Sequence, residues 1–202
     1  MKYITDKGSN KHLIITLHGT GGSASDLFDL AHYLDPLASK VGFQGEVNEN
    51  GMRRYFKRYP QGGYDLASLK KETKKLYSSI DKYIKDNQLE SYKITLLGYS
   101  NGANIAKNLL KEYKNIKIDN MLLFHPSPIT PETPFKNQKG LNLFMTSGQN
   151  DPYINEVEFA NLIQHMEAAD MNVESFTHPL GHQLTEEEVD MAKRFLSQLG
   201  DQ

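Results

Sequence analysis

Three residues of types that could form a nucleophilic site follow one another between the middle of the chain and its C-terminal end. Ser100 lies between two glycines in GYSNG, Asp151 lies in SGQNDPY, and His182 lies in HPLGHQLT. A serine hydroxyl is a weak nucleophile unless a base takes its proton, and that base needs a carboxylate to orient it. These residue types predict a triad with Ser100 as nucleophile, His182 as base and Asp151 as the orienting acid.

Each member of this triad has a competing interpretation. The pattern G-x-S-x-G also occurs by chance, because Gly and Ser are ordinary turn residues. Asp151 could simply form a turn before Pro152, and Asp170 is its main rival. His178 is the rival of His182, and we favour His182 because it follows a glycine in a loop that could bring it to the serine.

The segment LHGTGG (17–22) could supply a backbone donor to the same site. A tetrahedral acyl intermediate carries a negative oxygen, which backbone N–H groups stabilise. We expect the N–H groups of Thr20 and Asn101 to form this oxyanion hole. Because Asn101 would act through its backbone, its side chain should matter less than its position. His18 is expected to order the segment by hydrogen bonding.

A basic, aromatic and glycine-rich segment, 39–64, has no clear period and is predicted to be a functional loop. Arg53 and Arg54 in this segment either face solvent or hold an anionic group of the substrate. The residues expected to line a substrate pocket are Gly19, Gly21, Met52, Arg53, Phe56, Tyr99 and His125. The spacing of His, Asp and Glu does not indicate a metal site, and no cofactor is expected.

The elements that must position these residues alternate along the chain. Apolar runs that predict buried strands are 13–17, 92–97, 121–124, 141–146 and 173–177. Helical periods lie at 24–34, 66–83, 101–113, 155–169 and 186–199, and Thr185 with Glu188 has capping-box spacing before the last. This alternation predicts a three-layer α/β domain over 1–202, with a mostly parallel sheet, helices on both faces and no large lid domain. Each triad candidate follows a predicted strand, at the edge where such sheets bind ligands.

Composition restricts the classes of partner. The chain has 202 residues, a formal net charge of −2 and no cysteine. This charge does not favour nucleic acid or stable membrane association, and thiolate chemistry is excluded. The N-terminal apolar run of about five residues is too short for a signal-peptide core. We therefore expect a cytoplasmic protein with a small-molecule ester as partner, and a homodimer remains open.

Four segments together resemble the bacterial phospholipase/carboxylesterase family of α/β-hydrolases, which is related to the acyl-protein thioesterases. They are LHGTGG, LGYSNGANIA, SGQNDPYI and GHQLT, and ENGMRRYFKR is similar to a further segment of these small esterases. The similarity spans nearly the whole chain and keeps the order Ser, Asp, His of this fold. It implies a lidless serine esterase with Ser100, Asp151 and His182 as the triad. KRYPQGGYD departs from the family pattern, so substrate preference does not carry over.

The sequence therefore predicts a serine carboxylesterase that hydrolyses small, short-chain esters through an acyl-enzyme. An acyl thioesterase or a lysophospholipase would use the same chemistry. A binding protein with an idle triad is an alternative of another class, which the four intact site segments do not favour. Dienelactone hydrolysis on the same fold would favour a cysteine nucleophile, and the chain has none.

Overall fold

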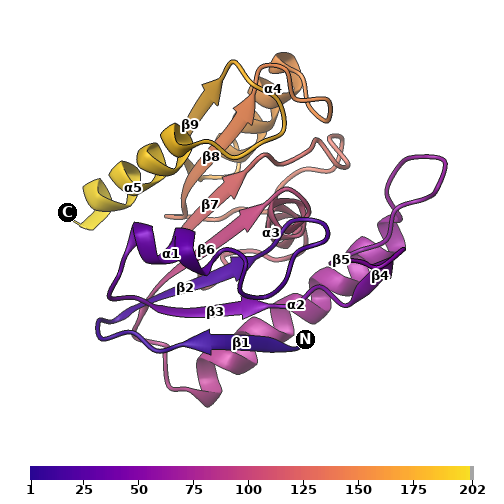
Figure 1. The fold of residues 1–202 in the computed structure, drawn as a ribbon. Coiled ribbons are helices and arrows are strands. Elements are labelled where there is room, and N and C mark those ends of the chain that lie inside the picture. Colours follow the sequence, from indigo (N-terminus) through magenta and orange to yellow (C-terminus); the bar gives the residue numbers. More distant parts are fainter. Residues whose placement is uncertain (201–202) are drawn as a thin grey trace.

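The computed structural model describes residues 1–200, which form a seven-stranded sheet with helices on both faces (Figure 1). The strands of this sheet are β1 (Tyr3–Asp6), β2 (His12–Leu17), β3 (Ser39–Phe43), β6 (Lys93–Tyr99), β7 (Asn120–Phe124), β8 (Asn142–Gly148) and β9 (Asn172–His178). Their order across the sheet is β1-β3-β2-β6-β7-β8-β9, and every neighbouring pair is parallel except β1 with β3. The predicted three-layer, mostly parallel α/β arrangement is confirmed.

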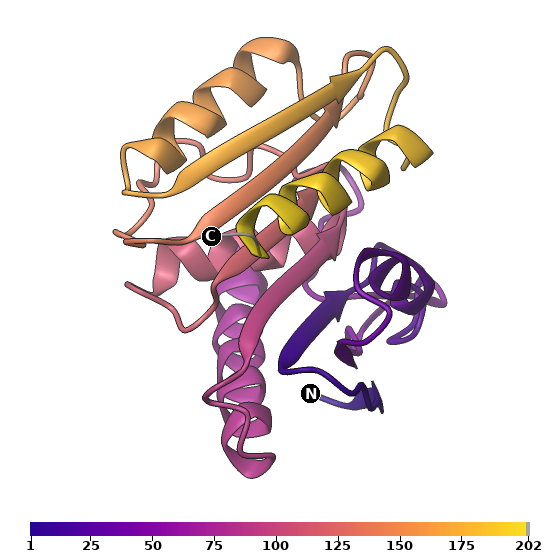
Figure 2. The same ribbon diagram turned by 90° about the vertical axis from the view of Figure 1, so that its left-hand side faces the viewer.

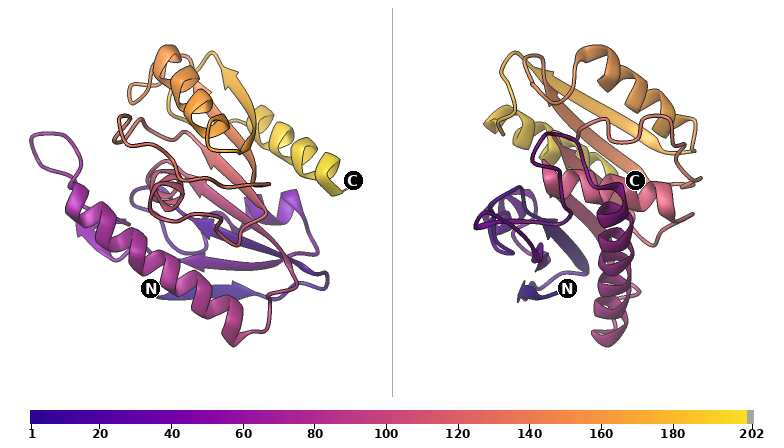
Figure 3. Two further views of the ribbon diagram at one scale, coloured as in Figure 1. Left: turned by 180° about the vertical axis from the view of Figure 1, so that it is seen from behind. Right: turned by 90° about the vertical axis from the view of Figure 1, so that its right-hand side faces the viewer.

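Two hydrophobic cores lie on the two faces of the sheet. The helices are α1 (Phe28–Leu34), α2 (Leu66–Asp86), α3 (Asn101–Glu112), α4 (Glu156–Glu167) and α5 (Glu186–Gly200). Apolar side chains of α2, α3 and α4 join one core, while those of α1 and α5 join the other. In β2 the alternation of a strand sends Leu13 and Ile15 to the first core and Ile14 to the second. Figures 2 and 3 show α5 and α4 on opposite sides of β8 and β9, and the long helix α2 on the face opposite α1.

The five predicted strands and five predicted helices are present, but β1 and β3 were not predicted. The segment 39–64 is also more regular than expected, because it contains β3 and a hairpin of β4 (Val47–Glu49) and β5 (Met52–Arg54). β3 has no continuous apolar run, since Lys40 and Gly42 interrupt it. Both exceptions have tertiary partners: Lys40 pairs with Asp6 of β1 at 3.1 Å, and a Cβ on Gly42 would lie 1.7 Å from the carbonyl oxygen of Ala24.

The carboxyl ends of neighbouring strands bring distant parts of the chain together. Ser100 follows β6 and His125 follows β7, while Asp151 and His182 lie shortly after β8 and β9. Thr20 lies shortly after β2, which pairs with β6. Among residues 1–200, no helix has the length and apolar character needed to cross a membrane.

Candidate active site

Ser100 lies in a sharp turn that the two flanking glycines make possible. Its φ of 51° and ψ of −113° fall in a region that side chains rarely adopt, and its N–H donates to the carbonyl of Phe124 at 2.9 Å. A Cβ on Gly102 would lie 2.0 Å from the carbonyl oxygen of Leu17. A Cβ on Gly98 would lie 2.8 Å from the backbone of Gly102. Strand β6 can therefore pass into α3 closely enough to β2 only because both glycines lack side chains.

A chain of hydrogen bonds links the serine, the histidine and the aspartate. Ser100 Oγ lies 2.8 Å from His182 Nε2, and His182 Nδ1 lies 2.7 Å from Asp151 Oδ2. The Asp151 side chain has no exposed surface, and its second oxygen accepts the N–H of Tyr153 at 2.9 Å. Because Nδ1 of His182 keeps its proton and donates a hydrogen bond to Asp151, Nε2 has a lone pair that can accept the serine proton.

Tyrosines on both sides hold the loop that carries His182. Tyr99 donates its hydroxyl to the carbonyl of His182 at 3.0 Å, and the Tyr153 ring meets the imidazole edge-on at 4.7 Å. The rival His178 belongs to β9, is buried and lies beside His125. Within residues 1–200, no hydrogen bond links His178 to Ser100 or to Asp151. Asp170 bonds to Asn137 in the turn between α4 and β9. The structure thus brings Asp151 and His182, and neither rival, to Ser100.

The segment after β2 is held in place by its own histidine and by strand β5. His18 Nδ1 donates to the carbonyl of Gly19 at 2.6 Å, and its Nε2 accepts the N–H of Gly45 at 3.0 Å. Burial lowers the pKa of His18 despite its bond to Gly19, which agrees with the neutral ring that these two contacts need. The N–H of Gly21 donates to the carbonyl of Arg53 at 2.8 Å. His18 therefore orders this segment, as expected.

A cavity of about 280 Å³ opens beside Ser100. The predicted site residues that border it are Thr20, Met52, Tyr99, Ser100, Asn101 and His182. Asn101 is also the first residue of α3, and the first N–H groups of a helix have no partner within it. Ser100, His182 and both residues of the predicted oxyanion hole thus face one space.

These features can be compared with known proteins. The phospholipase/carboxylesterase family matches residues 3–199, nearly the whole chain. The chain belongs to the phospholipase/carboxylesterase family. A relative from Bacillus subtilis (strain 168), named "Putative hydrolase MhqD", is 34% identical over 195 residues, which cover 96% of this chain and 97% of that protein.

Solved structures agree with this family membership. The Bacillus cereus carboxylesterase is 36% identical with a TM-score of 0.92, and the match covers 98% of this chain and 94% of that one. YahD, solved with malic acid, is 30% identical with a TM-score of 0.87, and the match covers 98% of each chain. The fold of this phospholipase/carboxylesterase family member is therefore an α/β-hydrolase fold, as its sequence predicted.

Five residues predicted to line the pocket of this carboxylesterase family member do not border the cavity. His125 and Phe56 are fully buried, so their predicted place in the pocket is wrong. Gly19, Gly21 and Arg53 also lie outside the lining, and Arg53 is exposed. Of Arg53 and Arg54, only Arg54 borders the cavity, because successive side chains of β5 point to opposite sides.

Six further residues border the cavity that sequence analysis did not assign to it: Arg54, Arg58, Tyr64, Asn104, Ser127 and Tyr153. Arg54 is 2% exposed and donates from NH1 to the hydroxyl of Thr20 at 2.7 Å. Its pKa is lowered by burial and then by the charge of Arg58. Both guanidinium groups pair with one carboxylate, since Glu49 lies 3.3 Å from Arg54 Nε and 2.8 Å from Arg58 NH2. Arg58 and Tyr64 belong to the basic aromatic loop, which was the available sequence signal.

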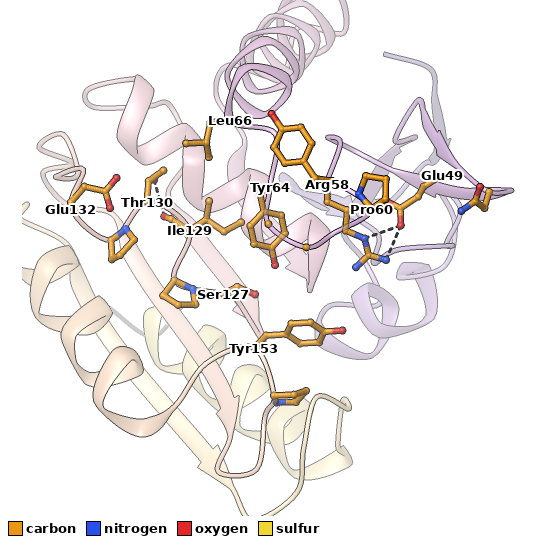
Figure 4. Close-up of a pocket in the computed structure, with 17 residues that line it drawn as sticks. Glu49, Arg58, Pro60, Tyr64, Leu66, Ser127, Ile129, Thr130, Glu132 and Tyr153 are labelled. Carbon is orange, nitrogen blue, oxygen red and sulfur yellow. Dashed lines mark hydrogen bonds and ion pairs between the residues drawn. The ribbon is translucent and has the colours of Figure 1, made fainter.

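A larger groove of about 960 Å³ continues from this cavity and shares Arg58, Tyr64, Ser127 and Tyr153 with it. Figure 4 shows Tyr64, Ser127 and Tyr153 around the groove, with Arg58 and Glu49 paired at one side. Its other walls come from the loops 59–66 and 127–132. The cavity beside Ser100 therefore opens into a partly apolar groove.

Two groups of buried or partly buried histidines and carboxylates have ligand atoms close enough together to surround a metal ion. In the group of His125, Asp151 and His182, Asp151 Oδ2 already forms hydrogen bonds with Nδ1 of both histidines. In the group of His125, His178 and Glu188, Nδ1 of His178 accepts the N–H of Leu180 at 3.1 Å. Nε2 of His178 therefore carries the ring proton and has no lone pair for a metal. Neither group fits a metal site.

Proposed function

We propose that this hydrolase-family chain is a serine carboxylesterase that acts on small carboxylic esters through an acyl-enzyme. The observation that carries the proposal is the hydrogen-bond chain from Ser100 Oγ through His182 to Asp151, at 2.8 and 2.7 Å. The positive φ of Ser100 in the turn between β6 and α3 supports it as well, because strained backbone of this kind is typical of nucleophiles on such turns.

The reaction follows from this geometry. Ser100 Oγ attacks the acyl carbon while Nε2 of His182 accepts its proton, and Asp151 stabilises the imidazolium that forms. The proton then passes to the departing alcohol, and the C–O bond of the ester breaks. Water attacks the acyl-enzyme with His182 again as base, which releases the acid and restores the serine. The N–H groups of Thr20 and Asn101 would stabilise the negative oxygen of both tetrahedral intermediates.

Charge at the cavity favours an ester that carries an anionic group. Arg54 and Arg58 share the single carboxylate of Glu49, so this side of the cavity has an excess positive charge. An arginine binds a carboxylate through two parallel N–H donors. YahD, a structural relative, was solved with malic acid, a small hydroxy acid with two carboxyl groups. This ligand supports a substrate that carries a carboxylate.

The rates of hydrolysis of p-nitrophenyl esters with increasing acyl-chain length test the proposal. We expect hydrolysis of short acyl chains by the wild type, and loss of hydrolysis and of fluorophosphonate labelling in Ser100→Ala. Hydrolysis only of long-chain esters, or a higher kcat/KM on matched thioesters, would favour the lysophospholipase or thioesterase alternative. No hydrolysis of any ester together with no labelling would instead support a binding protein with an idle triad.

A further inference from the structure

His125 lies directly behind the triad, between two carboxylates. It follows β7 with a φ of 55°, and its side chain has no exposed surface. Nδ1 of His125 lies 3.1 Å from Asp151 Oδ2, the oxygen that also faces His182. Nε2 of His125 lies 2.8 Å from Glu188 Oε1, and both carboxylate side chains are fully buried. The imidazole therefore bridges the triad acid and the first turn of α5.

These two contacts determine the protonation state of the ring. A neutral imidazole has one N–H and one lone pair, so one of its nitrogens would point a lone pair at a carboxylate oxygen. Burial alone lowers the pKa of His125, but the contact and charge of Glu188, followed by those of Asp151, outweigh burial and raise it. Burial raises the pKa of Glu188, but the contact and charge of His125, together with bonds from Thr146 and Thr185, outweigh burial and lower it. Both directions favour the charged forms, which agrees with the 2.8 Å separation of His125 Nε2 and Glu188 Oε1.

The remaining groups around the ring do not supply another charge. The N–H of Leu180 on Nδ1 of His178 leaves the ring proton of His178 on Nε2. This nitrogen lies 3.2 Å from Glu188 Oε2 and 3.4 Å from His125 Nε2, and the nearer, negatively charged oxygen is the stronger acceptor for its proton. Thr185 donates its N–H to Glu188 Oε2 at 2.7 Å and its Oγ accepts the N–H of Glu188 at 3.3 Å, which forms the predicted capping box. The Thr185 hydroxyl also donates to Glu188 Oε2 at 2.9 Å. Two rings complete the surroundings of His125, those of Tyr99 at 6.1 Å and His182 at 5.2 Å.

We propose that His125 is a positioning residue of the triad: a buried imidazolium, balanced by Glu188, that orients the Asp151 carboxylate and limits the basicity of His182. The inference rests on the proposed function. Asp151, Glu188 and His125 together leave one net negative charge beside His182. The imidazolium formed during attack would neutralise that charge, whereas without His125 two negative charges would favour premature protonation of His182.

The pH profile of kcat/KM tests this role, because a purely structural residue would not shift it in a defined direction. His125→Asn keeps a donor near Asp151 and tolerates the left-handed backbone, but it removes the positive charge. We expect the midpoint of the acidic limb to rise by about 1 pH unit. Glu188→Gln is the matched variant, and removal of its negative charge should not raise the midpoint. An unchanged midpoint in His125→Asn, or an equal rise in both variants, would overturn the proposal.

A measurement without substrate separates this inference from the proposed function. Correlation spectra of ring nitrogens and protons in the ¹⁵N-labelled wild type at pH 7 should show two protonated nitrogens on one buried histidine. Loss of this signal in His125→Asn assigns it, and if that variant does not fold, Glu188→Gln assigns it by a change in the signal. A His125 ring with one protonated nitrogen would refute the inference even if esters are hydrolysed. Two protonated nitrogens in a protein that hydrolyses no ester would instead support the charged bridge and refute the esterase proposal.

Discussion

The side chain of Asn101 accepts a hydrogen bond from the backbone N–H of Tyr55 at 2.8 Å. Both residues are buried, and the bond joins the turn of Ser100 to the segment that follows β5. Arg54, the last residue of β5 and the neighbour of Tyr55, bonds to Thr20. The Asn101 side chain, which was expected to matter less than the position of the residue, therefore has a structural contact of its own, because its amide joins the turn of Ser100 to the segment after β5.

Asn101→Ala should lower the free energy of unfolding by about 1–3 kcal/mol, since the buried N–H of Tyr55 would lose its acceptor. Asn101→Asp keeps an acceptor and should be less destabilised. Its carboxylate would nevertheless lie beside the proposed oxyanion hole and lower kcat/KM. Urea unfolding and ester kinetics on the two variants measure these effects. Wild-type stability in Asn101→Ala would contradict the structural role of the amide.

His182→Ala should reduce kcat/KM by about 10³-fold or more, because Ser100 would lose the base that accepts its proton. His178→Ala is the matched control, since His178 is also near Asp151 but contacts Glu188 instead of the serine. We expect less than about a tenfold loss in this variant, in line with an indirect role. The reverse result, with activity retained in His182→Ala and lost in His178→Ala, would exchange the two assignments.

Gly102→Ala should prevent folding or destabilise the protein by several kcal/mol, at least about 3. The new Cβ would lie 2.0 Å from the carbonyl oxygen of Leu17, in the backbone of β2. Gly200→Ala is the control, because a Cβ there meets no atom within 4 Å. Thermal melting of both variants measures the difference. Equal melting temperatures would mean that α3 can move away from β2 at little cost.

Arg58→Met should reduce kcat/KM for an ester that carries a carboxylate, such as a hemisuccinate, by about tenfold relative to a neutral ester of the same length. The exposed guanidinium borders the cavity and shares Glu49 with Arg54, so its loss removes the excess positive charge. Lys57→Met changes a neighbouring exposed charge that does not border the cavity. An equal loss on charged and neutral esters would argue against recognition of an anionic group.

Two buried histidines should contribute to stability with opposite dependence on pH. The folded pKa of His18 is below its ordinary value of 6.5, so its contribution is present above pH 6.5 and is lost as the pH falls. The folded pKa of His125 is above 6.5, so its contribution is complete below that pH and is lost as the pH rises through the raised pKa.

Urea unfolding of the wild type, His18→Gln and His125→Asn from pH 5 to pH 9 measures these contributions. The stability difference between wild type and His18→Gln should shrink toward acid. The difference between wild type and His125→Asn should shrink toward alkali. A parallel response in the two variants would contradict the assigned protonation states.

Local patterns in the sequence were sufficient for the α/β architecture and for the choice of triad candidates. Buried parallel strands need continuous apolar runs, and amphipathic helices need a repeating apolar face, so both are visible in short windows. The edge strand β1 and its neighbour β3 lack such runs, since all four residues of β1 are exposed and Lys40 in β3 depends on a distant partner. The sequence also placed Ser100, Asp151 and His182 after three strands of one parallel sheet, β6, β8 and β9, whose carboxyl ends lie at the same edge.

Tertiary structure alone decided which neighbours complete the site. In sequence His125 could equally have faced a substrate, and only the packing of α5 against β8 and β9 places Glu188 on its far side. Likewise, Arg54 rather than Arg53 reaches the cavity, because the two side chains point to opposite sides of the short strand β5. Such contacts join residues far apart in the chain, so their geometry depends on the packed fold rather than on local composition.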